Sequence, residues 1–197
     1  MALLKADLSR ETEMNGLVDT ATKALGPLAA LVNSASIFEN DDWYSADRAS
    51  WDKHLEINLR APFVLAQHFA RQVPRDGRGA IINIIDQRVL KPTPQFISYS
   101  VSKAALYWLN QTLAQALAPR IRVNAVAPGP VMKNERQSEA DFSRQRKATL
   151  LGRGAEPQDI CSAVRYLLDA ENVTGQMIAV DGGQHLIWQT PDVAGRE

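Results

Sequence analysis

A tyrosine and a lysine four residues apart are the first side chains in this sequence that could do chemistry together. Tyr99 and Lys103 lie in the run 98–118, whose spacing predicts a helix, so the phenol and the ammonium share one face. A free tyrosine titrates near about 10, and a neighbouring cation lowers that pKa toward the range where a phenol can give and take a proton. The pair predicts a general acid tuned by a cation, although the spacing alone is also common on solvated helix faces.

Short apolar segments alternate with amphipathic segments along the chain. The predicted strands are 3–6, 28–33, 80–85, 121–126 and 176–180. The predicted helices are 9–25 with Ser9 as its N-cap, 46–73 with a kink or division at Pro62, 98–118 and 157–169. The polar run 134–150 is predicted to be a mobile helical lid. Near-continuous apolar strands alternating with helices predict an α/β fold, a doubly wound parallel sheet covered on both faces.

The residues that follow several of these strands lie at the same edge of the predicted sheet. They are Asp7, the segment 33–36, Asp86 and the segment 128–129. In such sheets ligands bind beyond the carboxyl ends of the strands, and the helix that carries Tyr99 begins at this edge. We therefore expect these groups to converge on one crevice, in an arrangement suited to proton transfer beside a bound planar cofactor.

Composition limits the class of protein. The chain has 197 residues, 45% of them hydrophobic, which predicts one domain over residues 1–189 followed by a tail at 190–197. Twenty-two basic and twenty-two acidic side chains cancel, so no global field favours nucleic acid or an anionic membrane. No long apolar run or signal pattern is present, and the single cysteine, Cys161, is predicted to be a core residue. We expect a cytoplasmic protein, without a metal site because its three histidines lack ligand spacing.

The chain resembles the short-chain dehydrogenase/reductase family over nearly all of its length. Tyr99 and Lys103 match the catalytic pair, and Asn58 matches the helix asparagine of the catalytic tetrad. The segment 33–36, Asn-Ser-Ala-Ser, stands where the family has Asn-Asn-Ala-Gly, and 122–129 resembles the strand and turn that meet the nicotinamide. The resemblance implies a Rossmann-like, NAD(P)-dependent oxidoreductase with a small-molecule substrate.

The resemblance also implies roles for individual residues. Lys103 would hold the nicotinamide ribose as well as tune Tyr99, and Asn58 would hold a water that links Lys103 to solvent. The implied cofactor-binding residues are Asp7, Leu8, Asn33, Ser34, Ala35, Ser36, Tyr99, Lys103, Pro128, Gly129 and Val131. The family further implies a homo-oligomer, a tetramer or a dimer, and we expect Trp188 in the apolar C-terminal segment to lie at its interface.

One position departs from the family pattern in an informative way. Asp86 stands where the family has its catalytic serine, thirteen residues before Tyr99. This substitution resembles the pteridine reductase and dihydromonapterin reductase branch, and Phe38 stands where those enzymes sandwich the pterin against the nicotinamide. The implied activity is NADPH-dependent reduction of a pterin-like or related planar ring, with NADP favoured over NAD. The implied catalytic set is Tyr99, Lys103, Asp86 and Asn58, and the implied substrate-binding set is Phe38, Asp86 and Tyr99.

The chemistry of a carboxyl group fits that resemblance. Asp86 follows the apolar pair Ile84 and Ile85, where desolvation favours the protonated form and so allows proton donation or relay. The charged form could instead hold the amino-pyrimidine edge of a pterin. Two other functions stay open: a carbonyl reductase with Asp in place of the usual Ser, and a weak or inactive family member that keeps only an oligomer or scaffold role.

The beginning of the family pattern has no counterpart in this sequence. The family's first strand, glycine-rich turn and second strand are not found, and 3–6 resembles its third strand, followed by Asp7 where an aspartate meets the adenine. We therefore expect an N-terminally truncated sheet without its first two strands. An internal methionine of a longer gene is the favoured explanation; a genuine fragment, or direct pairing of 3–6 with 28–33, are the others.

Overall fold

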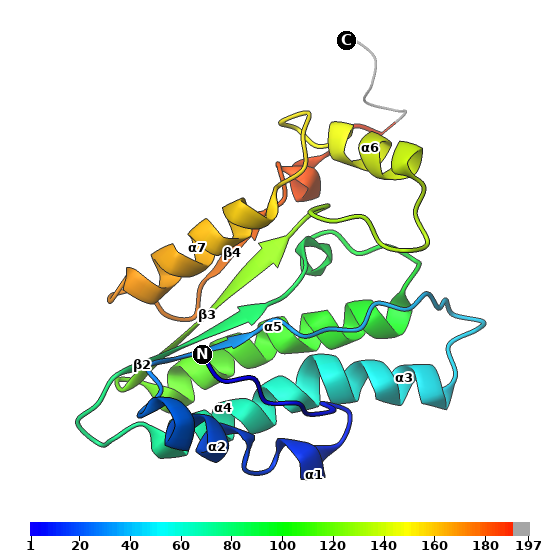
Figure 1. Ribbon diagram of the computed structural model, residues 1–197. Coiled ribbons are helices and arrows are strands. Elements are labelled where there is room, and N and C mark those ends of the chain that lie inside the picture. The colour runs from blue at the N-terminus through cyan, green and yellow to red at the C-terminus, as the bar shows by residue number, and fades with distance from the viewer. Residues whose placement is uncertain (191–197) are drawn as a thin grey trace.

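A four-stranded parallel sheet forms the centre of the computed structural model, which describes residues 1–190 (Figure 1). The strands lie in the order β1 (Ala30–Asn33), β2 (Gly79–Ile84), β3 (Ile121–Pro128) and β4 (Met177–Val180). The long helices are α2 (Leu17–Leu25), α3 (Arg48–Leu55), α4 (Ala61–Gln72), α5 (Ile97–Leu117), α6 (Glu139–Lys147) and α7 (Pro157–Asp169). This arrangement confirms the predicted α/β fold and four of the five predicted strands.

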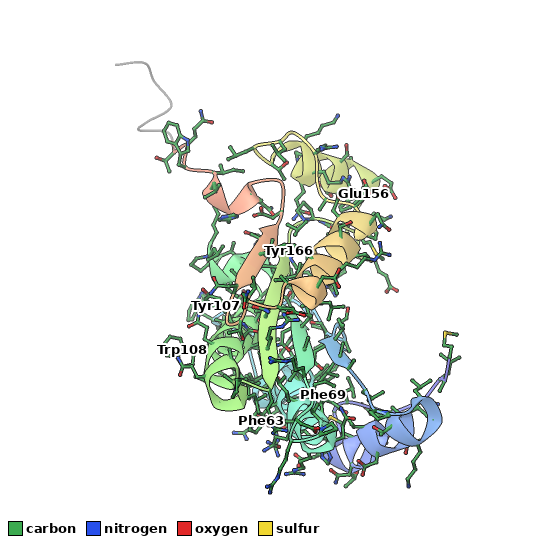
Figure 2. The ribbon with its side chains drawn as sticks, turned by 90° about the vertical axis from the view of Figure 1, so that its left-hand side faces the viewer. Phe63, Phe69, Tyr107, Trp108, Glu156 and Tyr166 are labelled. Atoms are coloured by element: carbon green, nitrogen blue, oxygen red, sulfur yellow. The ribbon has the colours of Figure 1, made fainter. Side chains whose placement is uncertain are left out.

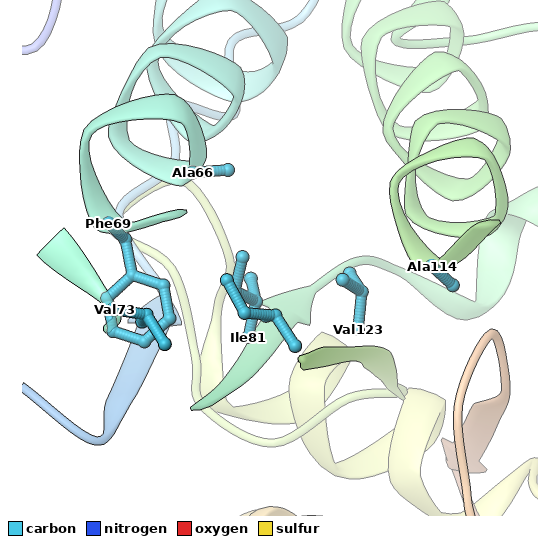
Figure 3. Close-up of a cluster of buried hydrophobic side chains, with 7 residues drawn as sticks. Ala66, Phe69, Val73, Ile81, Ala114 and Val123 are labelled. Carbon is cyan, nitrogen blue, oxygen red and sulfur yellow. The ribbon is translucent and has the colours of Figure 1, made fainter. Parts of the chain in front are cut away.

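Alternation along the strands divides the core between two faces of the sheet. Ile81 and Val123, which are neighbours in the β2–β3 register, pack against Phe69 of α4 and Ala114 of α5 (Figure 3). The next β2 residue points the opposite way, as the two-residue period requires. Ile82 accordingly packs with Val126 and Leu167 on the face that α7 covers.

The helical region before β2 is divided near Pro62, as predicted. Between α3 and α4 lies a π-helical turn, η1 (Glu56–Arg60), and Pro62 occupies the first turn of α4. Proline has no amide to donate to the residue four positions earlier, so the regular α pattern is interrupted just before it. That earlier residue is Asn58, which lies inside the π turn and is fully buried.

The predictions for the N-terminal region are partly wrong. Residues 3–6 form no strand, because within residues 1–190 they pair with no other strand, and Leu3 is 86% exposed. The predicted helix is split into α1 (Glu11–Met14) and α2 by Gly16, whose φ is 81°. Ser9 does not cap it; its amide and hydroxyl both donate to Asp7. The helix does end at Gly26, as predicted, with a φ of 82°.

The C-terminal third supplies the remaining elements around the sheet edge. Helix α6 lies in the predicted lid, and short 3-10 turns η2 (Gln87–Val89) and η3 (Gln184–Leu186) follow β2 and β4. None of the helices among residues 1–190 combines the length and apolar character needed to cross a bilayer. Most of the predicted tail, residues 191–197, lies outside the described residues. Trp188 is 63% exposed, and Trp108, 68% exposed, lies on the outer side of α5 (Figure 2); the predicted oligomer interface stays a prediction.

The packing of α7 against the sheet gives a test of the fold. Leu167 has no exposed surface, so Leu167→Ala should lower the free energy of unfolding by about 2–5 kcal/mol through lost burial and a cavity. Tyr166, its neighbour on α7, is 57% exposed, and Tyr166→Ala is the matched control, expected to cost much less (Figure 2). Urea denaturation of both variants measures the difference. Equal losses would contradict the described packing of α7.

Candidate active site

A cavity of about 970 Å³ opens at the carboxyl ends of the strands. Its walls come from the segments that follow β1, β2 and β3, from the start of α5, and from the regions of α6 and α7. The predicted site residues that line it are Ser34, Ser36, Phe38, Asp86, Tyr99, Lys103, Pro128, Gly129 and Val131. The parallel sheet thus brings together groups that are far apart in the sequence, because its strand ends share one edge.

The hydroxyl of Tyr99 donates a hydrogen bond of 2.7 Å to the Asp86 carboxylate. Tyr99 is 6% exposed, and burial raises the pKa of its phenol well above the ordinary value. The charge of Asp86 and the hydrogen bond itself raise the pKa further, while Arg88 acts in the opposite direction. The expectation that the pKa of Tyr99 lies below its ordinary value is therefore wrong for the structure, because desolvation and the carboxylate outweigh the effect of nearby positive charge.

Lys103 lies beside this pair and is also buried. Its Nζ donates to the carbonyl of Ile84 at 3.0 Å and lies 5.8 Å from the centroid of the Tyr99 ring. Burial lowers the pKa of Lys103 to about 8, although Asp86 acts to raise it. An ammonium has three N–H donors, and only one has a partner among residues 1–190. Two donors are therefore left for hydroxyl groups of a ligand.

An aromatic pair forms one side of the cavity. Phe38 stacks on Phe96 with ring centroids 4.3 Å apart and an angle of 14° between the planes. Tyr99 meets Phe38 edge to face at 4.6 Å. Because no third ring fits between rings at stacking distance, the face of Phe38 that Phe96 covers is closed to a ligand.

Phe96 is a site residue that the sequence did not single out. Its φ of 58° lies in the left-handed region, which is rare for a bulky residue and costs about 1–3 kcal/mol. The residue directly precedes α5 and its amide donates to the carbonyl of Asp41 at 2.7 Å. The only sequence signal was its type and position, an aromatic residue three places before Tyr99.

A buried hydrogen-bond network holds the start of α5. Ser98 donates its amide and hydroxyl to Asp41, and Ser50 adds a hydroxyl bond of 2.7 Å to the same carboxylate. The His54 ring contacts the Ser98 hydroxyl at 2.7 Å and accepts the amide of Glu39 at 3.2 Å. Burial by itself raises the pKa of Asp41, but the hydrogen bonds from Ser98 and Ser50 outweigh it and hold that pKa below its ordinary value. The network fixes Tyr99 and the Phe38 segment relative to each other.

Asn58, in the π turn, forms hydrogen bonds with the segment that carries Phe38. Its Oδ1 accepts from the amide of Ile37 and the hydroxyl of Ser36, at 2.9 and 3.0 Å. Its Nδ2 donates to the carbonyl of Ile37 and to the Ser102 hydroxyl. These four bonds use the full capacity of the amide, so the side chain has none left for a water. In this structure Asn58 positions the loop that carries Phe38, and it does not line the cavity.

The other predicted residues lie outside the cavity. The Asp7 carboxylate accepts from Ser9, and Leu8 packs against the apolar cluster around Met14. Asn33 donates to the Asn83 side chain at 2.9 Å, a contact inside the sheet. Ala35 is exposed and borders no described cavity.

Cys161 and Gly129 also lie on the cavity wall. Cys161 is exposed and lines the cavity, so its predicted place in the core is wrong; on α7 its neighbours Ile160 and Val164 are the residues that pack toward the core. Gly129 approaches the turn after β4 so closely that a Cβ atom would lie 2.7 Å from the Cα of Asp181.

Residues 1–190 contain no group of His, Cys, Asp and Glu side chains that could bind a metal ion.

Comparisons with known proteins agree with this architecture. A family model described as enoyl-(acyl carrier protein) reductase matches residues 1–185. A short-chain type dehydrogenase/reductase of Picea abies is 34% identical over 188 residues, 91% of this chain and 69% of that protein.

Two solved structures are also similar. FolM alternative dihydrofolate reductase 1 from Brucella canis, complexed with NADP, is 48% identical with a TM-score of 0.94, covering 98% of this chain and 76% of that chain. The protein of the same name from Brucella suis, also in complex with NADP, is 50% identical with a TM-score of 0.92, covering 96% and 76%.

The lowered pKa of Lys103 predicts a pH dependence of stability. Above about pH 8 the folded chain loses the Lys103 proton, while the unfolded chain keeps it up to about 10.4. The unfolded state therefore binds more protons in this window, and the Lys103 contribution makes the free energy of unfolding rise with pH. Relative to Lys103→Met, wild type should gain up to about 2 kcal/mol between about pH 8 and 9.5 in urea denaturation. Lys147→Met, at an exposed lysine, should run parallel to wild type; a Lys103→Met curve parallel to both would contradict the burial of the ammonium.

Proposed function

Because the chain belongs to the short-chain dehydrogenase/reductase family of oxidoreductases, we propose that it is an NADPH-dependent reductase of a pterin-like planar ring. The observation that carries the proposal is the hydrogen bond between Tyr99 and Asp86, a carboxylate at the position of the family's serine. Similarity at 48–50% identity to two proteins named alternative dihydrofolate reductase, each complexed with NADP, supports both the ring and the cofactor.

The residues around the cavity fit the nicotinamide end of such a cofactor. Lys103 offers two free N–H donors to ribose hydroxyls, and the turn from Pro128 to Val131 and Ser34 line the same cavity. When bound, the nicotinamide supplies the hydride. The remaining steps of the reaction belong to this chain's own side chains.

Tyr99 is the proton donor in this proposal. Because its pKa is raised, the phenol keeps its proton at neutral pH and donates it in a hydrogen bond to the Asp86 carboxylate. An amino-pyrimidine edge carries N–H groups that would compete for the same carboxylate. Once Asp86 accepts those groups, its charge opposes proton loss from Tyr99 less strongly, and the Lys103 cation stabilises the phenolate that forms. Asp86 thus anchors the ring and controls the acid.

Removal of the phenol hydroxyl tests the proton donor. Tyr99→Phe should lower turnover of a dihydropterin by at least about a hundredfold, the usual contribution of a positioned general acid. NADPH binding, followed by fluorescence titration, should remain, since the hydroxyl bonds to Asp86 in the structure. Normal turnover in Tyr99→Phe would eliminate the mechanism. Failure of the wild type to bind NADPH would instead favour a member of the family without catalytic activity.

Substitutions of Asp86 distinguish a pterin reductase from a carbonyl reductase. Asp86→Asn keeps the shape and loses the charge, and Asp86→Ser restores the family's usual residue. Both should lower kcat/KM for a dihydropterin by about 10- to 100-fold, because a hydrogen bond to a charged group contributes about 1.5–3 kcal/mol. The wild type is expected to prefer dihydropterins over a panel of ketones in the same NADPH assay. Ketone turnover that rises in Asp86→Ser, with no dihydropterin turnover in the wild type, would support the carbonyl reductase.

A further inference from the structure

Two arginines from distant parts of the chain lie over the aromatic pair of the cavity. The Cζ atom of Arg88 is 5.0 Å from the Phe96 ring centroid and 5.4 Å from that of Phe38. The Cζ atom of Arg136, from the segment before α6, is 5.6 Å from the Phe38 centroid. Both arginines line the cavity. The 3-10 turn η2 after β2 and the segment between β3 and α6 therefore place two guanidinium groups at one aromatic surface.

Neither guanidinium is neutralised by a carboxylate. Among residues 1–190 no ion pair involves Arg88 or Arg136, in contrast to Arg144 and Arg146 nearby, which pair with Asp141 and Glu156. Arg88 donates from Nη1 to the Thr93 hydroxyl at 3.0 Å, and Arg136 donates from Nη2 to the carbonyl of Phe38. Each guanidinium has five N–H donors, so most of them remain available.

The surrounding charges leave this corner of the cavity positive. Glu39, close enough for Arg136 to help lower its pKa, is already paired with Lys53, whose hydrogen bond is the main cause of that lowering. Asp86 bonds to Tyr99 and to the backbone amide of Arg88. Both of these carboxylates are therefore already engaged elsewhere, and Asp86 is the one acidic side chain among the described residues that line the cavity.

We propose that Arg88 and Arg136 bind an anionic substituent, a carboxylate or a phosphate, carried by the planar substrate. The inference rests on the proposed function for the ring itself, and it adds the chemistry at the far end of the substrate. A guanidinium can pair with either a carboxylate or a phosphate through two parallel hydrogen bonds. The substrate class is thus a pterin-like ring with a negatively charged side chain.

The two arginines also make cation–π contacts with the aromatic rings, so their loss would act in part through Phe38. A misplaced Phe38 would impair every substrate that uses the ring surface. An anion site would impair only substrates that carry the anion. The decisive quantity is therefore the ratio of kcat/KM for a charged and an uncharged substrate with the same ring.

The experiment compares reduction of dihydrofolate, which carries carboxylates, with reduction of dihydrobiopterin, which carries none. In Arg136→Gln the dihydrofolate-to-dihydrobiopterin ratio of kcat/KM should fall about tenfold, as expected for loss of a charge-assisted hydrogen bond. Arg88→Gln should lower the ratio as well, and Arg136→Lys should retain part of it. Arg144→Gln is the matched control, because Arg144 is 74% exposed, pairs with Asp141 and does not line the cavity. The ratio in wild type should also fall as the NaCl concentration rises.

A second substrate pair distinguishes the two anions. Dihydroneopterin and its monophosphate replace the first pair, and the larger drop in Arg136→Gln identifies the preferred group. Unchanged ratios in both Arg136→Gln and Arg88→Gln for both pairs would overturn the inference and leave the proposed function standing. If the wild type reduces no dihydropterin, the proposed function fails by itself. In that case, calorimetric titration of folate and biopterin tests the anion site. The site requires that Arg136→Gln weaken folate binding more than biopterin binding. Equal weakening of both would refute the anion site.

Discussion

The hydrogen bond from Tyr99 to Asp86 is the interaction on which the electrostatics of the site depend. It joins the segment just after β2 to the first turn of α5. Helix α5 also carries Lys103. Burial and the carboxylate raise the pKa of the phenol, while burial lowers the pKa of Lys103 to about 8. At neutral pH the proton therefore rests on Tyr99 and the positive charge rests on Lys103, which is the starting state that proton donation requires.

Most of the fold could be predicted because local patterns determine it. The apolar runs that became β1 to β4 alternate with amphipathic helices, and parallel strands share one carboxyl edge, so the convergence of Asp86, Tyr99 and the turn after β3 followed directly. The run 3–6 has the composition of a strand but forms none, because a strand exists only with a partner, and composition says nothing about partners.

The features that could not be predicted all depend on contacts distant in sequence. Arg136 reaches the Phe38 carbonyl from 98 residues away, and the left-handed conformation of Phe96 is supported by a bond to Asp41. Asn58 was predicted by its motif, but its four hydrogen bonds to the Phe38 loop and to α5 appear only in the folded chain. The direction in which the pKa of Tyr99 shifts was also predicted wrongly, because the sequence shows a neighbouring cation and does not show the depth of burial.

Arg88 acts both on the proton donor, Tyr99, and on the aromatic pair Phe38 and Phe96. Its charge lowers the pKa of Tyr99, against the effects of burial and Asp86, and the same guanidinium lies over Phe38 and Phe96. An anion held by Arg88 would cancel part of that charge and leave Tyr99 a weaker acid. Arg136 lies over Phe38 and is not among the main causes of the raised pKa of Tyr99. A charged substituent bound mainly by Arg136 would therefore cost Tyr99 less of its acidity than one bound mainly by Arg88.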